Sequence, residues 1–124
     1  MSYLYQEILM DHYRNPRNNG ILARYNVREE QRNSSCGDEI LFTGIIEHNI
    51  LVDVAFQGKG CVISQAMASL LSEQVKGMSL DDIGFLDQDD LCAMLGMQLG
   101  PVRLLCALLS LMALQKGIRE YATK

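Results

Sequence analysis

Apolar and polar positions alternate in the middle of the chain, and this alternation predicts a small antiparallel sheet. Within Ile50–Gln57 two sets of side chains alternate with the period of two that is typical of a strand. Ile40–Glu47 is predicted as a second strand, and His48 and Asn49 between them suit a tight hairpin turn. A short edge strand near Tyr25–Val27 would bring the sheet to three strands. The side chains expected to share one face of the last strand are Ile50, Val52, Val54 and Phe56.

Apolar residues at three- and four-residue spacing predict helices before and after this sheet. The first covers residues 3–14 and ends before a proline, which pushes the preceding residue out of the helical region. A second helix begins near Cys61, and shorter ones follow Ser79 and cover Asp87–Leu95. A last helix covers residues 101–121, with proline in its first turn. It is apolar nearly all round from Val102 to Leu114, so it should be largely buried.

Length and composition suit one globular domain spanning residues 1–124. The predicted elements make it an α+β domain, with a small antiparallel three-stranded sheet and helices packed on one face. A net charge of −4 argues against a nucleic-acid partner, since phosphate binding usually needs a basic surface. The longest apolar stretch, Leu104–Leu114, is shorter than the roughly 20 residues that span a bilayer. Residues 1–16 lack the pattern of a signal peptide, so a cytoplasmic protein with no membrane partner is expected.

The chain has four cysteines, which in a reducing compartment are expected to be metal-bound or reactive rather than disulfide-linked. None forms a CxxC pair, which disfavours a zinc ribbon or a thioredoxin-like motif. Cys36 lies in a polar turn before a predicted strand, next to Gly37 and Asp38; by itself it suits a ligand and an incidental turn residue equally. Cys61 opens a helix, where the helix macrodipole and the nearby Lys59 favour the thiolate, the form that binds metals. The alternative for Cys61 is a small buried residue at a strand–helix junction.

The other candidate residues give weaker local signals. The apolar neighbours of Cys106 predict a core cysteine, although Arg103, one turn earlier on the same helix face, suggests that this face meets a site. Cys92 is predicted to serve packing only. His12 and His48 are predicted as surface groups.

Four segments of the chain resemble the U-type iron–sulfur cluster assembly scaffold family, which includes IscU, SufU and NifU-like proteins. In order they are Met10–Asn18, Cys36–Asp38, Gly58–Cys61 and Pro101–Cys106. Together they cover nearly the whole chain and are specific, although each alone is short. The first half of the chain is similar to SufU, but the insertion that SufU members carry before the third cysteine has no counterpart here. The chain is identified as a short member of the family with a SufU-like first half.

The resemblance implies a ligand set. Cys36, Cys61 and Cys106 match the three family cysteines, and Asp38 matches the family aspartate that takes part in metal or cluster binding. These residues would bind a transient [2Fe–2S] cluster, or Zn²⁺ in the resting state, since thiolates suit both. Leu105 replaces the histidine that precedes the third cysteine in IscU members, so no histidine ligand is expected there. We expect the oxygen of Asp38 to hold a cluster less firmly than a fourth thiolate would.

The resemblance also implies a function and partners. A scaffold accepts sulfur from a cysteine desulfurase, binds iron and passes the cluster to acceptor apoproteins, without necessarily turning over a small molecule. Cys106 would accept the sulfur, with Arg103 stabilising its negative charge. Leu99–Arg103 departs from the Leu-Pro-Pro-Val-Lys type of stretch that docks an Hsp70-type chaperone, so that partner is not expected. Two alternatives stay open: a zinc-dependent sulfur transferase accessory to a cysteine desulfurase, and a structural zinc domain.

Overall fold

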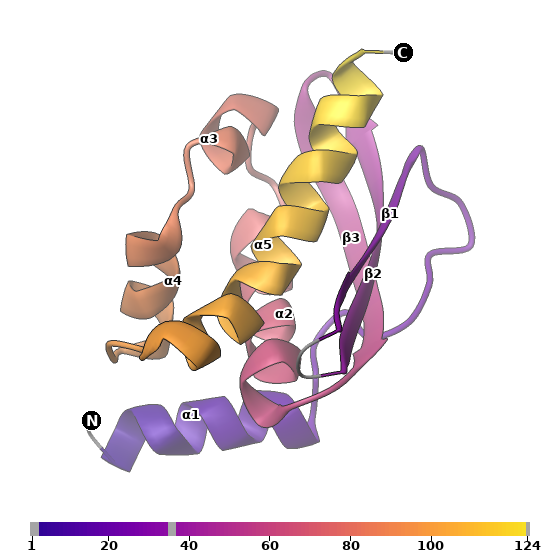
Figure 1. Ribbon diagram of the computed structural model, residues 1–124. Helices are drawn as coiled ribbons and strands as arrows, with labels where there is room; N and C mark the ends of the chain where they lie inside the picture. Colours follow the sequence, from indigo (N-terminus) through magenta and orange to yellow (C-terminus); the bar gives the residue numbers. More distant parts are fainter. Residues whose placement is uncertain (1–2, 35–36, 124) are drawn as a thin grey trace.

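The computed structural model describes residues 3–34 and 37–123. In these ranges three antiparallel strands form one sheet in the order β1-β2-β3, accompanied by five helices (Figure 1). The elements are α1 (Tyr3–Arg14), β1 (Val27–Asn33), β2 (Asp38–Glu47), β3 (Ile50–Lys59), α2 (Val62–Val75), α3 (Leu80–Gly84), α4 (Gln88–Leu95) and α5 (Pro101–Ala122). The predicted α+β class and the three-stranded antiparallel sheet are confirmed.

The hairpin of β2 and β3 contains a bulge that the alternation did not reveal. Ile45 pairs with Asp53 and Ile46 with Leu51, so Val52 is an extra residue in the ladder. The bulge reverses the alternation: Leu51 is 0% exposed and joins Val54 in the core, whereas Val52 is 39% exposed. The expectation that Val52 shares a face with Val54 and Phe56 was therefore wrong.

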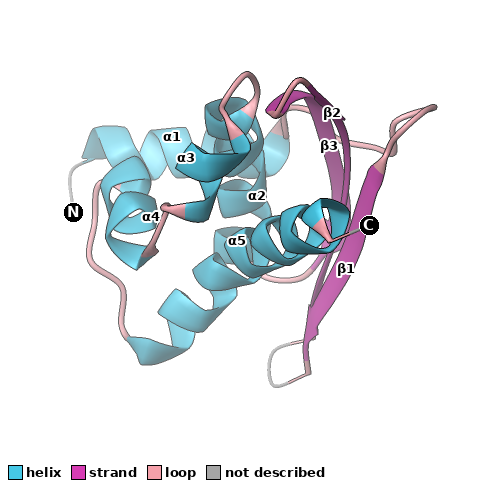
Figure 2. Cartoon of the chain, turned by 90° about the horizontal axis from the view of Figure 1, so that it is seen from above, coloured by secondary structure: helices cyan, strands magenta, loops and turns pink. Residues whose placement is uncertain are grey.

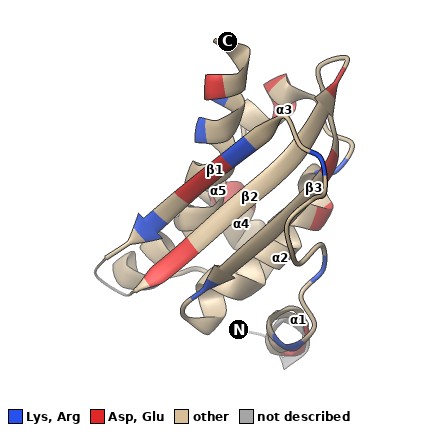
Figure 3. Cartoon of the chain, turned by 90° about the vertical axis from the view of Figure 1, so that its right-hand side faces the viewer, with Lys and Arg blue, Asp and Glu red and all other residues tan. Residues whose placement is uncertain are grey.

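Strand β1 is longer than the predicted strand near Tyr25–Val27 and lies further along the chain, at Val27–Asn33. It is an edge strand, and Figure 3 shows bands of both charges along it. Arg32 forms ion pairs with Glu30 at 2.9 Å and with Glu39 of β2 at 3.3 Å. Charged side chains on an edge strand discourage pairing with another chain. The same charges mask the strand in the sequence, because the hydrophobic pattern is weak there.

Helices α2 and α5 cover one face of the sheet, which Figure 2 shows from above. Helix α5 packs against β1 and β2, and α2 packs against β3 and α5. Gly117 allows close approach, since a Cβ atom there would lie 3.0 Å from Cγ1 of Val27. By length and composition alone α5 could cross a membrane, a test that core helices of soluble proteins also pass. Here one side of α5 is buried against the sheet and α2, as expected for a core helix.

His12 is buried rather than on the surface, contrary to the sequence-based expectation. It is 6% exposed, and its Nδ1 lies 2.7 Å from Oγ of Ser69 in α2. The backbone N–H of Arg17 donates to the same Oγ at 2.9 Å, so the hydroxyl hydrogen remains for Nδ1 of a neutral ring. Nε2 of His12 lies 3.5 Å from Glu73. These contacts fasten α1 and the segment after it to α2.

Burial lowers the pKa of His12, and Arg17 lowers it further, while Glu73 and Asp11 oppose the shift. Because the folded-state pKa lies below the unfolded value near 6.5, the unfolded chain binds more protons in acid. The contribution of neutral His12 to stability is therefore complete above about pH 6.5 and is lost as the pH falls.

Replacing His12 with Gln should accordingly flatten the decline of the free energy of unfolding between pH 7 and 5, measured by urea denaturation. His48→Asn is the matched control: the other histidine lies at the hairpin tip with φ 53°, which asparagine tolerates. An equal flattening in both variants, or in neither, would contradict the role assigned to His12.

Candidate metal centre

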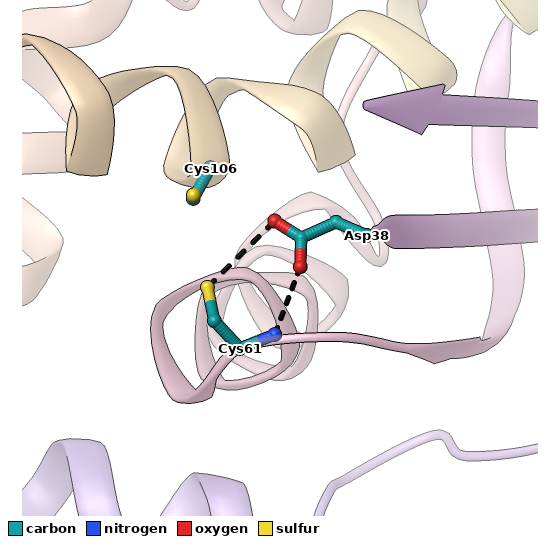
Figure 4. Close-up of side chains that lie close together, drawn as sticks. All are labelled: Asp38, Cys61 and Cys106. Carbon is teal, nitrogen blue, oxygen red and sulfur yellow. Dashed lines mark hydrogen bonds between the residues drawn. The ribbon is translucent and has the colours of Figure 1, made fainter. Parts of the chain in front are cut away.

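Three side chains from distant parts of the chain converge at one end of the sheet: Asp38, Cys61 and Cys106 (Figure 4). One carboxylate oxygen and the two Sγ atoms all lie within 4.8 Å of one another. The three residues come from the start of β2, the start of α2 and the second turn of α5. All three were predicted as ligands, and the structure brings them together.

Asp38 is the first residue of β2 and is 0% exposed. Its Oδ1 accepts a hydrogen bond of 2.8 Å from the backbone N–H of Cys61, and its Oδ2 lies 3.7 Å from Sγ of Cys61. Among the described residues no basic side chain forms an ion pair with Asp38. Since a buried carboxylate needs a compensating charge, a cation between Asp38 and the two sulfurs would stabilise it.

Cys61 is the N-cap residue of α2, as the sequence predicted. Its Sγ accepts from the backbone N–H of Ser64 at 3.4 Å, and the side chain is partly exposed. Lys59, expected to add a positive charge near the thiol, is 75% exposed and lies 3.7 Å from Glu39. The polar contact of Sγ is therefore with the N-terminus of α2, and Lys59 pairs with Glu39 instead.

Cys106 is buried on α5, with 4% of its surface exposed. Local sequence favoured a core cysteine, and Cys106 is buried as that predicts. The family resemblance favoured a ligand, and its Sγ lies within 4.8 Å of the other two donor atoms. Arg103 is exposed in the first turn of α5, and Leu105, in place of the family histidine, is 56% exposed. Gly100 caps this helix without a side-chain hydrogen bond.

The remaining candidates are placed as follows. Cys36 lies outside the described residues, so its predicted part in the site stays a prediction. Cys92 is buried in α4, in agreement with a packing role. His48 lies at the hairpin turn, also as predicted.

The donor set suits zinc or an iron–sulfur cluster. Zinc bonds to sulfur at about 2.3 Å and to carboxylate oxygen at about 2.0–2.2 Å, so ligand atoms on one tetrahedral ion lie roughly 3.3–3.8 Å apart. The oxygen of Asp38 and the two Sγ atoms lie within 4.8 Å of one another, so they would need to move about one ångström closer together to bind one zinc ion. Asp38, Cys61 and Cys106 could hold zinc with one more ligand, and zinc would stabilise their ionised forms.

Gly60 supports the site, although the sequence analysis assigned it no role beyond its place in the Gly58–Cys61 segment. Its φ is +140°, and a Cβ atom there would overlap Oδ1 of Asp38. The sequence signal for this role was a glycine directly before the cysteine that opens a helix. The sequence could not show that this glycine packs against the buried Asp38, because the two residues are 22 positions apart in the chain.

The sequence is similar to those of known proteins over most of its length. Residues 4–124 match the family model described as the NifU-like N terminal domain. The zinc-dependent sulfurtransferase SufU of Bacillus subtilis is 34% identical over 134 residues, covering 94% of this chain and 90% of that protein. The iron–sulfur cluster assembly scaffold protein IscU of Aquifex aeolicus is 36% identical over 126 residues, covering 100% of this chain and 80% of that protein.

Solved structures agree with the fold. A crystal structure described as an iron–sulfur cluster assembly scaffold for the SUF system, from Fervidobacterium islandicum, has a TM-score of 0.78 and 25% identity, covering 95% of this chain and 99% of that one. The N-terminal part of a NifU-like protein from Brucella abortus has a TM-score of 0.78 at 19% identity, covering 97% of this chain and 95% of that one. The second likeness concerns the fold alone.

Gly60→Ala should displace the Asp38 carboxylate and disturb the site. Because the backbone conformation and the overlap both disfavour a side chain, we expect a loss of about 1–3 kcal/mol in the free energy of unfolding and weaker binding of zinc. Calorimetric titration with zinc and urea denaturation measure the two effects.

Gly84→Ala in α3 is the matched control, since a Cβ atom there meets nothing within 4 Å. A Gly60→Ala protein that equals the Gly84→Ala protein in zinc affinity and stability would show that Gly60 does not support the site.

Proposed function

We propose that this chain, which belongs to the NifU-like N-terminal domain family, is a scaffold on which an iron–sulfur cluster is assembled and from which it is transferred. The observation that carries the proposal is the convergence of Asp38, Cys61 and Cys106 within 4.8 Å. Relatives named as IscU scaffold proteins, at 33–36% identity over nearly the whole chain, support it. Cys36 is proposed as the third cysteine ligand.

A scaffold needs a site that can be filled and then emptied. Two thiolates offer ligands for iron, and Asp38 offers a harder oxygen that binds cluster iron less firmly than a thiolate does. Asp38 also holds the N–H of Cys61, which fixes the start of α2. We therefore assign Asp38 both a positioning role and a ligand role. A [2Fe–2S] cluster is the proposed cargo.

The proposed sulfur step uses Cys106 as acceptor. Its thiolate would attack the outer sulfur of a persulfide on a cysteine desulfurase; a new sulfur–sulfur bond forms at Cys106, the old one breaks, and the desulfurase cysteine leaves as a thiolate. Reduction of that sulfur to sulfide consumes electrons, which oxidation of Fe²⁺ and an external reductant together supply. The exposed Arg103 is proposed to stabilise the anionic persulfide.

Burial of Cys106 adds a requirement to this step. With 4% of its surface exposed, the thiol needs local opening before a partner can reach it. The first turn of α5 is the part suited to open, since Gly100 provides no side-chain cap and Pro101, Val102 and Arg103 are exposed.

A second candidate function is a zinc-dependent sulfur transferase. It is favoured by the similarity to SufU of Bacillus subtilis, which is named for that activity and is 34% identical over 94% of this chain. In this alternative zinc would hold the resting thiolates, and the chain would carry sulfur as an accessory to a cysteine desulfurase. Both candidates share the desulfurase as partner; acceptor apoproteins belong to the scaffold alone. We also propose that the protein acts in the cytoplasm and that residues 1–124 form a single domain.

Anaerobic reconstitution with iron, cysteine and a cysteine desulfurase separates the candidates. The scaffold should develop the visible absorption of a cluster and pass it to an apo-ferredoxin, and Cys61→Ser and Cys106→Ser should each reduce cluster yield at least tenfold. Cys92→Ser, which replaces the packing cysteine, is the control and should retain the yield. Strong stimulation of desulfurase turnover by the zinc-loaded chain, with no cluster formed, would instead establish the transferase.

Asp38→Ala should lengthen the lifetime of the reconstituted cluster, because the labile oxygen ligand is gone. The decay of visible absorbance in the presence of a chelator measures this lifetime. Faster decay in Asp38→Ala than in the unchanged protein would show that the fixing of Cys61 outweighs the lability of the oxygen ligand.

A further inference from the structure

A groove with a volume of about 550 Å³ lies between α3 and the C-terminal half of α5. Its apolar lining includes Leu80, Ile83 and Ile118, with Phe85 at the end of α3 and Asp81 and Arg119 as charged groups. Ile118 is 12 residues after Cys106 on the same helix, a distance of roughly 18 Å along the axis at 1.5 Å per residue. The groove is thus separate from the metal centre.

The wall formed by α3 is held in place. Nε2 of Gln115 on α5 donates to the carbonyl oxygens of Ile83 and Leu86 at 3.0 and 2.9 Å. At the other end the N–H of Leu80 donates to the carbonyl oxygen of Asn49 in the hairpin turn at 3.0 Å. A groove whose walls are already fixed loses little conformational freedom when a partner binds.

One large apolar side chain that lines this groove faces solvent, and another is exposed one helix turn before the lining residue Gln115. Phe85 is 82% exposed, and Met112, one turn before Gln115 on α5, is 52% exposed. An exposed aromatic ring beside a preformed groove is typical of a surface that anchors a partner. The length of α5 from Met112 to Ala122, about 15 Å, matches three turns of a docked helix.

The charges beside the groove identify the kind of partner. The segment that forms α3 and α4 contains five aspartates and no lysine or arginine; they are Asp81, Asp82, Asp87, Asp89 and Asp90. Figure 1 shows both helices on the same side of α5. The groove lining itself contains one acidic and one basic residue, Asp81 and Arg119. The C-terminal part of α5 adds Lys116 and Glu120, so acidic groups outnumber basic ones only when the other aspartates of α3 and α4 are included.

We infer that the α3–α5 groove is a docking surface for a basic amphipathic helix of a partner protein, separate from the metal centre. The apolar face of that helix would cover Phe85 and Met112, and its basic edge would face the aspartates of α3 and α4. A second copy of this chain does not fit as the occupant, because two such surfaces brought together would oppose their acidic helices. Nor does α1 carry an excess of basic residues: its charged groups are Glu7, Asp11 and Arg14.

The probe for this surface is a synthetic 18-residue helical peptide of leucine and lysine with one apolar face. Its comparators are a scrambled sequence of the same composition and a version with glutamate for lysine. Fluorescence anisotropy gives the dissociation constant at low and high salt, and amide chemical shifts of the ¹⁵N-labelled full chain locate the contact.

The basic peptide should bind saturably, more weakly at high salt, with shift changes concentrated in residues 80–86 and 112–122. Phe85→Ser should weaken binding at least tenfold, whereas Ile21→Ser, a matched change at an apolar residue 55% exposed elsewhere, should leave it within twofold. Thermal melting verifies that both variants fold, as the exposure of both side chains leads us to expect.

Absence of saturable binding would overturn the inference, as would equal binding of the scrambled or glutamate peptide. Shift changes centred on Asp38, Cys61 and Cys106 would also overturn it. A self-associating chain whose association is abolished by Phe85→Ser would identify a second copy as the occupant and contradict the proposed partner.

Discussion

The arrangement of the metal centre depends on the hydrogen bond between the buried Asp38 carboxylate and the backbone N–H of Cys61. Its Oδ1 accepts a hydrogen bond from the N–H of Cys61, which links the start of β2 to the start of α2. Its Oδ2 points toward Sγ of Cys61. Only glycine at position 60 leaves room for this carboxylate. A single side chain therefore orients a helix, places a thiol and offers an oxygen ligand. The free-energy cost of burying its charge is offset best when a cation is bound.

The rest of the fold brings the third donor to this carboxylate. Helix α5 lies across β1 and β2, closely enough that a Cβ atom on Gly117 would lie 3.0 Å from Cγ1 of Val27. This packing sets Cys106 beside Cys61, 45 positions earlier in the chain. Because the donors come from β2, α2 and α5, metal binding and packing of these elements are coupled. The α3–α5 groove lies further along the same helix, so a partner docked there would not cover the metal centre.

Local pattern was enough to predict the helices, the hairpin and the position of Cys61 at a helix start, since spacing and cap residues act over a few positions. It failed where tertiary contacts decide: the bulge at Val52, the charged edge strand β1 and the burial of His12 have no local signature. Cys106 is the instructive case, since its neighbours are those of a core residue, and its prediction as a ligand came mainly from the resemblance between whole sequences, with Arg103 as a local hint. The groove beside Phe85 was also beyond sequence reasoning, because its two walls are distant in the chain.

X-ray absorption at the zinc edge of the zinc-loaded protein tests the metal centre most directly. The account predicts a first shell dominated by sulfur at about 2.3 Å with one oxygen at about 2.0–2.2 Å, and loss of one sulfur in each of Cys61→Ser and Cys106→Ser. The oxygen should disappear or change in Asp38→Ala. A shell of oxygen and nitrogen only, or a sulfur count unchanged in both cysteine variants, would contradict the assignment of these residues as the metal centre.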